Sequence, residues 1–150
     1  MKVRDLMTSP AVVIGGDASF DEIVGVLLDN DVSGVPVVDD RGRLIGMVTE
    51  ADLLSREGYG SRRRQPLGLV AEYLRGHDPQ WVRKAAGQRA RELMCHVVIT
   101  ASPDDDIGVV ARTMLEEHHK RLPVVDDGHV VGVISRQDLL AAHATGRRPA

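Results

Sequence analysis

An internal repeat constrains this chain more than any other feature. Three blocks recur in the same order in its two halves, the first two displaced by 87 residues and the third by 86. The paired blocks are residues 4–7 and 91–94, residues 35–40 and 122–127, and residues 46–54 and 132–140. Because three matched blocks in one order are improbable by chance, we predict two copies of one small folding unit. We place them at residues 2–56 and 89–144, with an insert at 57–88 and a tail at 145–150.

The first half of each copy predicts a strand followed by an amphipathic helix. The apolar runs Ala11–Ile14 and Val97–Ala101 are the expected strands. Apolar residues then recur at helical spacing, which gives each copy one apolar helix face. The predicted faces consist of Phe20, Ile23, Val24, Leu27 and Leu28, and of Ile107, Val110, Ala111, Met114 and Leu115. The stretches with the form of a capping box, expected at the helix starts, are residues 19–22 and 102–105.

The second half of each copy predicts a hairpin and a closing helix. In the first copy, Val35–Val38 and Leu44–Thr49 are β-branched runs separated by a turn, and a helix is expected from Glu50; its counterpart starts at Arg136. One copy of about 55 residues is marginal as an isolated domain, because it buries too little of its surface. We therefore predict an α/β fold of the α+β type, in which two β-α-β-β-α copies pack sheet to sheet with pseudo-two-fold symmetry. The insert is expected to be basic and partly helical.

Composition and charge exclude several classes of protein. Hydrophobic residues make up 43% of the chain and charged residues 27%, as in ordinary soluble domains. The net charge of −3 is not the strongly basic charge expected of a nucleic-acid-binding domain. No stretch approaches the roughly 18 apolar residues of a membrane span, and none resembles a signal peptide. Cys95 is the single cysteine, so no intrachain disulfide can form, and a cytoplasmic location is expected.

The repeated blocks resemble those of the CBS (cystathionine-β-synthase) family. The resemblance is carried by the R-[DE]-L-M opening, the [VL]-P-V-V-D strand and the G-x-[VI]-[ST]-x-x-D-L-L ending, each present twice. It covers both copies but not the insert. It implies a disc of two joined repeats, pairing of such discs into dimers, and a regulatory role. Members of the family often bind AMP, ATP or S-adenosylmethionine in clefts between the repeats.

The S/T-x-x-D ending is the candidate binding motif. A nucleotide needs an apolar slot for its base, acceptors for the ribose hydroxyls and donors for phosphate. Thr49 and Ser135 are expected at a strand end just before a helix, where a hydroxyl and free N–H groups suit phosphate. Asp52 and Asp138 follow one turn later, and the resemblance implies that they accept ribose hydroxyl groups. Such residues are also ordinary helix caps that need no ligand.

The remaining candidate residues would hold the base and the phosphate. The base slot is expected to consist of Val12, Val13, Val35 and Pro36 from the first copy, and of Val98, Ile99, Leu122 and Pro123 from the second. Each of these side chains also suits plain core packing. The resemblance nominates Lys120 and Arg121 for phosphate, whereas the first copy has no cation in the corresponding stretch. Cations after a helix are also favoured by the helix dipole alone.

Other signals carry less weight. Cys95-His96 and His118-His119 match no standard zinc spacing, so no metal site is predicted. Acidic residues 104–106 are explained by a first helical turn. No hydrolase, metalloprotease or P-loop motif is present, so the chain is not expected to be an enzyme and no catalytic residue is assigned.

We therefore predict a regulatory module whose ligand is an adenine nucleotide, AMP, ADP or ATP, alone or with Mg²⁺, and which has no covalent cofactor. A homodimer and an unidentified protein effector are expected, with no membrane partner. The first alternative is a protein-interaction scaffold with an empty cleft, working through its insert. A less favoured alternative is nucleic-acid binding through Arg62–Arg64, which lacks interleaved aromatic residues for stacking.

Overall fold

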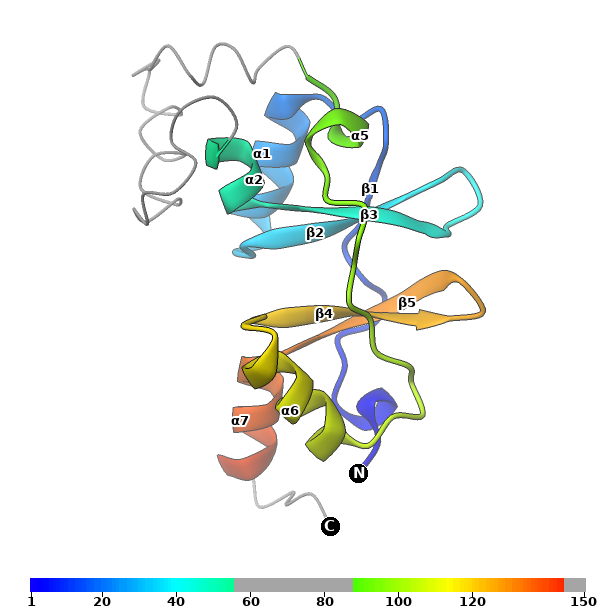
Figure 1. Ribbon diagram of the computed structural model, residues 1–150, viewed down its shortest axis with the longest axis vertical. Coiled ribbons are helices and arrows are strands. Elements are labelled where there is room, and N and C mark those ends of the chain that lie inside the picture. Colours follow the sequence, from blue (N-terminus) through cyan, green and yellow to red (C-terminus); the bar gives the residue numbers. More distant parts are fainter. Residues whose placement is uncertain (56–87, 145–150) are drawn as a thin grey trace. The chain divides into compact units, whose positions relative to one another are not determined.

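The structure, a computed structural model, describes residues 1–55 and 88–144 (Figure 1). The elements of the first copy are the 3₁₀ helix η1 (Val3–Asp5), β1 (Ile14–Gly15), α1 (Phe20–Asp29), β2 (Gly34–Val38), β3 (Leu44–Thr49) and α2 (Glu50–Ser55). Those of the second are α5 (Ala90–Leu93), α6 (Ile107–Glu116), β4 (Arg121–Asp126), β5 (His129–Ser135) and α7 (Arg136–Ala144). The mixed α/β fold is as predicted. The prediction of a basic, partly helical insert falls on residues outside those that the structure describes.

The chain divides into two compact units that do not coincide with the two copies. The first-repeat unit comprises residues 12–40 and 45–98, and the second-repeat unit comprises residues 1–11, 41–44 and 99–150. Each unit therefore contains the opening segment of the other copy: residues 1–11 lie in the second-repeat unit, and residues 89–98 lie in the first-repeat unit. The hairpin tip at residues 41–44 also joins the second-repeat unit, where Leu44 N donates to Gly128 O at 3.0 Å and Val130 N to Gly42 O at 3.2 Å.

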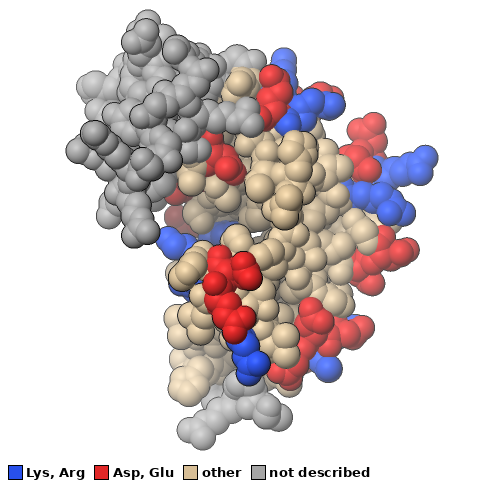
Figure 2. All heavy atoms as spheres, in the orientation of Figure 1, with Lys and Arg blue, Asp and Glu red and all other residues tan. Residues whose placement is uncertain are grey.

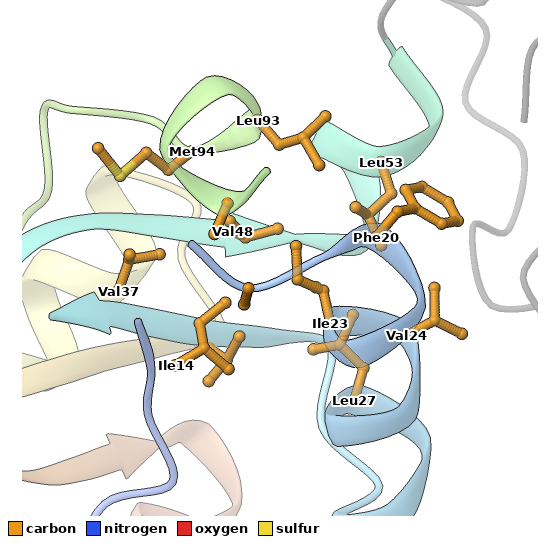
Figure 3. Packing of buried hydrophobic residues seen from close by; sticks show 13 residues of the cluster. Ile14, Phe20, Ile23, Val24, Leu27, Val37, Val48, Leu53, Leu93 and Met94 are labelled. Carbon is orange, nitrogen blue, oxygen red and sulfur yellow. The ribbon is translucent and has the colours of Figure 1, made fainter. Parts of the chain in front are cut away.

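The first-repeat unit is built on a three-stranded sheet in the order β1-β2-β3, with β1 parallel to β2. Helix α1 starts where the capping motif predicts, because Ser19 Oγ accepts the N–H of Glu22 at 3.2 Å. The buried face of α1 consists of Phe20, Ile23, Val24 and Leu27. It packs with strand residues such as Val37 and Val48 and with Leu93 of α5 (Figure 3). The predicted helix face therefore forms the core of this unit.

The second-repeat unit is built on the antiparallel pair β4–β5, in which Arg121 lies opposite Ser135. Helix α6 buries Ile107, Val110 and Met114 against it. The core is completed by Val3 of η1, which is 0% exposed. The prediction that Leu115 shares the buried face of α6 is wrong, because this side chain is exposed.

The structure also corrects the start of α6 and the first strands. The cap of α6 is Asp106, whose Oδ1 accepts the N–H of Gly108 at 2.8 Å, so residues 102–105 form the turn before the helix. Strand β1 is only two residues long, and its counterpart reduces to a bridge between Ala101 and Val124. The β-branched runs at 11–14 and 97–101 are thus mostly outside regular strands, because only their last residues find pairing partners.

The opening segments cross the sheets at two equivalent glycines. In the first-repeat unit, Met47 and Cys95 exchange main-chain hydrogen bonds of 3.0 and 2.9 Å, and a Cβ at Gly46 would lie 2.9 Å from Cys95 O. In the second-repeat unit, Thr8 and Val133 exchange bonds of 2.9 and 3.0 Å, and a Cβ at Gly132 would lie 2.9 Å from Thr8 O. The glycine that opens the third repeated block is therefore required for the close approach of the other copy's opening segment.

Equivalent ion pairs hold the same segments. Arg91 Nη2 contacts Asp17 Oδ1 at 2.6 Å in the first-repeat unit, and Arg4 pairs with Asp104 in the second. The two arginines are the first residues of the repeated R-[DE]-L-M block, and their partners are also 87 residues apart. All four side chains are largely exposed, so the pairs orient the segments more than they stabilise them.

Candidate functional site

The β5–α7 junction of the second-repeat unit holds two of the predicted residues in mutual contact. Asp138 Oδ2 accepts the N–H of Ser135 at 2.7 Å and its hydroxyl at 2.9 Å, while Ser135 Oγ accepts the N–H of Asp138 at 3.2 Å. The pair is thus a reciprocal helix cap at the start of α7. The capping interpretation is correct, and it fixes both side chains before any ligand arrives.

The β3–α2 junction of the first-repeat unit has the same arrangement. Asp52 Oδ2 accepts the N–H of Thr49 at 2.8 Å and its hydroxyl at 3.1 Å, and Thr49 Oγ1 accepts the N–H of Asp52 at 3.3 Å. Both residues are half-buried. The S/T-x-x-D ending of the repeat is therefore one local structure formed twice, with its serine or threonine at the strand end as predicted.

Capping leaves part of the Asp138 carboxylate available. A carboxylate offers about four lone-pair positions on two oxygens. Both bonds that Ser135 donates reach Oδ2, and among the described residues Oδ1 of Asp138 accepts none. The carboxylate can therefore accept a ligand hydroxyl without giving up the cap.

Three cationic residues lie at the second-repeat junction. Arg121 lies opposite Ser135 in the β4–β5 ladder and is half-buried, and Lys120 precedes it with an exposed side chain. The sequence analysis missed Arg136, the first residue of α7. Its N–H donates to Lys120 O at 2.9 Å, and its guanidinium donates to His119 O at 3.0 Å and Met114 O at 3.2 Å. The only signal for it was a cation directly after the motif's serine.

The first-repeat junction has the same main-chain geometry with different side chains. Glu50 N donates to Ser33 O at 2.9 Å, as Arg136 N does to Lys120 O. Glu50 is 9% exposed and occupies the position of Arg136. Gly34 occupies that of Arg121, and an added Cβ would lie 3.2 Å from Thr49 Cγ2 and 3.3 Å from Val48 O.

The residues predicted for a base slot divide into buried and accessible ones. The fully buried members are Val35, Pro36, Leu122 and Pro123. Val35 and Leu122 belong to the cores of their units, so core packing explains their burial. Val98 and Ile99 are half-buried, whereas Val12 and Val13 are 38% and 37% exposed. The accessible apolar surface in the first strand region is therefore at Val12 and Val13.

The described residues hold no group of three or more His, Cys, Asp or Glu side chains suited to a metal ion. Cys95 is exposed, and its thiol donates to Val97 O at 3.4 Å.

Among residues 1–55 and 88–144, no helix is both long and apolar enough to span a membrane.

The fold and its junctions define a tandem α/β repeat protein, with a capped hydroxyl–carboxylate pair at the end of each sheet. The chain belongs to the CBS domain family, whose sequence profile matches residues 3–58 and 90–145. The resemblance inferred from the three repeated blocks is thus confirmed.

Relatives and solved structures agree with this placement. The uncharacterized protein MJ1426 of Methanocaldococcus jannaschii is 30% identical over 153 residues, which cover 95% of this chain and 90% of that protein. The chloroplastic protein CBSX2 of Arabidopsis thaliana is 28% identical, and the match spans 57% of its length. In the crystal structure of CBSX2 in complex with AMP, 98% of each chain aligns at 28% identity with a TM-score of 0.74.

A third similar structure has other adenosine ligands. The CBS domain pair of protein MJ0100 was crystallised in complex with 5′-methylthioadenosine and S-adenosyl-L-methionine. It is 25% identical, covers 99% of this chain and 98% of its own, and has a TM-score of 0.70. CBS pairs similar to this one thus bind AMP in one case and sulfur-containing adenosine derivatives in another.

Proposed function

We propose that this chain is a regulatory, non-catalytic module that binds an adenine nucleotide at the β5–α7 junction. The observation that carries the proposal is the grouping of Arg121, Ser135 and Asp138, set by the ladder register and the helix cap. The AMP complex of CBSX2 supports adenine nucleotides as the ligand class.

The chemistry of each group suits one part of the nucleotide. The guanidinium of Arg121 carries five donors, so it can serve phosphate oxygens and keep a protein contact. The hydroxyl of Ser135 already donates to Asp138, and the N–H groups of Arg136 and Asp138 already have protein acceptors, so the phosphate contact rests on the charge of Arg121. Oδ1 of Asp138, which accepts no bond from the described residues, would accept the ribose hydroxyls. The module would act in the cytoplasm as a homodimer and pass the ligand signal to a protein effector.

A thermal-shift screen tests this function directly. The ligands are AMP, ADP, ATP, NAD and S-adenosylmethionine, each with and without Mg²⁺. A ligand at 100 times its dissociation constant stabilises the folded state by about 2.7 kcal/mol. This raises the melting temperature by about 5–10 °C for a chain of this size. No shift with any adenine compound would contradict the proposal.

Asp138→Asn is expected to weaken nucleotide binding about ten- to hundredfold. The amide keeps an oxygen that can accept the N–H of Ser135, but it loses the charge that strengthens hydrogen bonds to ribose. Binding would be measured by isothermal titration. The matched control is Asp126→Asn in the same unit, where the exposed carboxylate should be dispensable. Equal affinity in the Asp138 variant and in the parent would remove Asp138 from the site.

One observation favours the alternative of an interaction scaffold. Val109, Leu115 and Leu140, on α6 and α7, are large apolar side chains left exposed. Large apolar side chains that remain exposed are the kind of surface that a protein partner covers. Under this alternative no adenine compound shifts the melting temperature, and Leu115→Asp abolishes partner binding. On the face shown in Figure 2 acidic and basic side chains are interspersed, so this face offers no continuous basic surface to nucleic acid. Arg62–Arg64 lie outside the described residues.

A further inference from the structure

The methionine of each repeated R-[DE]-L-M block packs against the glycine at which its segment crosses the sheet. A Cβ added to Gly132 would lie 2.8 Å from Met7 Sδ and 3.2 Å from Met7 Cγ. In the first-repeat unit, Sδ and Cγ of Met94 occupy the same place against Gly46. Each methionine directly precedes the residue that forms the bridge to the sheet. The thioether is therefore part of the contact that holds each opening segment on its sheet.

The two equivalent methionines differ in burial. Met94 is 8% exposed and belongs to the core of the first-repeat unit. Met7 is half-buried and packs against the core of the second-repeat unit from outside it. The side chain of Met7 is therefore more accessible to a small solute than that of Met94.

The opening segment of the first copy is also anchored by fewer buried side chains. Among residues 1–11 only Val3 is buried, whereas residues 88–98 bury three side chains. The paired main-chain bonds between Thr8 and Val133 come directly after Met7 along the segment. A loss of packing at Met7 therefore acts beside this bridge, on a segment with one buried anchor.

We propose that Met7 is an oxidation site that controls the docking of the opening segment of the first copy on β5. Hydrogen peroxide transfers one oxygen atom to Sδ: the S–O bond forms, the O–O bond breaks and water leaves, so sulfur is oxidised and peroxide is reduced. The product is a polar sulfoxide in place of a flexible apolar thioether, which disfavours packing against Gly132. Methionine sulfoxide reductases reverse the change. The site is independent of ligand binding at the β5–α7 junction.

Treatment of the full chain with hydrogen peroxide tests this proposal, in a Cys95→Ser background that removes the thiol. Mass spectrometry follows each methionine, and we expect the sulfoxide of Met7 to form at least about tenfold faster than that of Met94. Hydrogen exchange of the Thr8 and Val133 amides should become about tenfold faster or more in the oxidised chain. The equivalent bridge in the first-repeat unit should be unchanged, and reductase treatment should restore slow exchange.

Two leucine variants assign the effect to one sulfur. Met7→Leu nearly conserves the apolar volume, so its melting temperature should stay within about 5 °C of the parent value. It should no longer respond to peroxide at Thr8 and Val133. The matched control is Met1→Leu, because Met1 is also half-buried against the core of the second-repeat unit. This variant should respond to peroxide as the parent does.

Three outcomes would overturn the proposal. Equal rates of oxidation at Met7 and Met94 would show that burial does not select the site. Complete conversion of Met7 to the sulfoxide with unchanged exchange at Thr8 and Val133 would show that the thioether does not control docking. A response to peroxide that persists in Met7→Leu would place the effect at another sulfur.

Discussion

Val3→Asp is expected to cost at least about 4 kcal/mol of the free energy of unfolding, because it buries an unpaired charge. Val3 is 0% exposed in the core of the second-repeat unit, although it belongs to the opening segment of the first copy. Its N–H donates to Asp105 O at 3.0 Å, so the main chain at this position is also held within the second-repeat unit. Total stabilities of such chains are about 5–15 kcal/mol, so the loss is a large part of the whole.

The measurement is urea unfolding followed by circular dichroism, with a melting temperature expected to fall by about 10 °C or more. The matched control is Val97→Asp, since Val97 is 86% exposed and the same substitution there should change the unfolding free energy by less than about 0.5 kcal/mol. If both variants unfold at the urea concentration of the parent, the opening segment does not belong to the second-repeat core.

The sequence patterns did not predict that each opening segment packs in the unit of the other copy. Repetition and periodicity predicted α1 and β3 correctly, since α1 begins after Ser19 and β3 spans Leu44–Thr49 as expected, whereas the two first strands and the start of α6 were wrong. The repeated block at residues 4–7 belongs to the first copy by sequence, but this pattern does not tell which of the two cores the neighbouring Val3 side chain packs into. That choice depends on long-range packing, to which two glycines and two exposed ion pairs contribute. Leu115 shows the same limit, because helical spacing cannot tell an apolar residue facing the core from one beside it.

The candidate site was predictable in its motif but not in its charge. The S/T-x-x-D ending predicted both junctions, and local geometry alone forms their caps. Glu50 and Arg136 stand at an unspecified position of that motif, so the motif gave no reason to single them out. Their equivalence emerges from the matching main-chain bonds, and the difference between the two junctions follows from it.

Gly132→Ala is expected to lower the free energy of unfolding by about 1–3 kcal/mol, the usual cost of overpacking. An added Cβ would lie 2.9 Å from Thr8 O and 2.8 Å from Met7 Sδ. The sulfur can move, but the carbonyl belongs to the bridge between Thr8 and Val133, so the opening segment itself must shift. Gly46→Ala should have a similar effect in the first-repeat unit, where Cys95 O stands in the same place.

The control for these substitutions is Gly25→Ala, which we expect to raise the free energy of unfolding instead of lowering it. Gly25 lies inside α1 with nothing within 4 Å of an added Cβ, so Gly25→Ala should stabilise the chain by about 0.5–1 kcal/mol through helix propensity. Urea unfolding compares the variants, and hydrogen exchange reports the amides of Thr8 and Val133. Faster exchange of both amides in Gly132→Ala would show that the segment has been displaced from the sheet. Unchanged exchange together with unchanged stability would mean that the methyl group is accommodated without moving Thr8, and the glycine would then have no role in docking the opening segment.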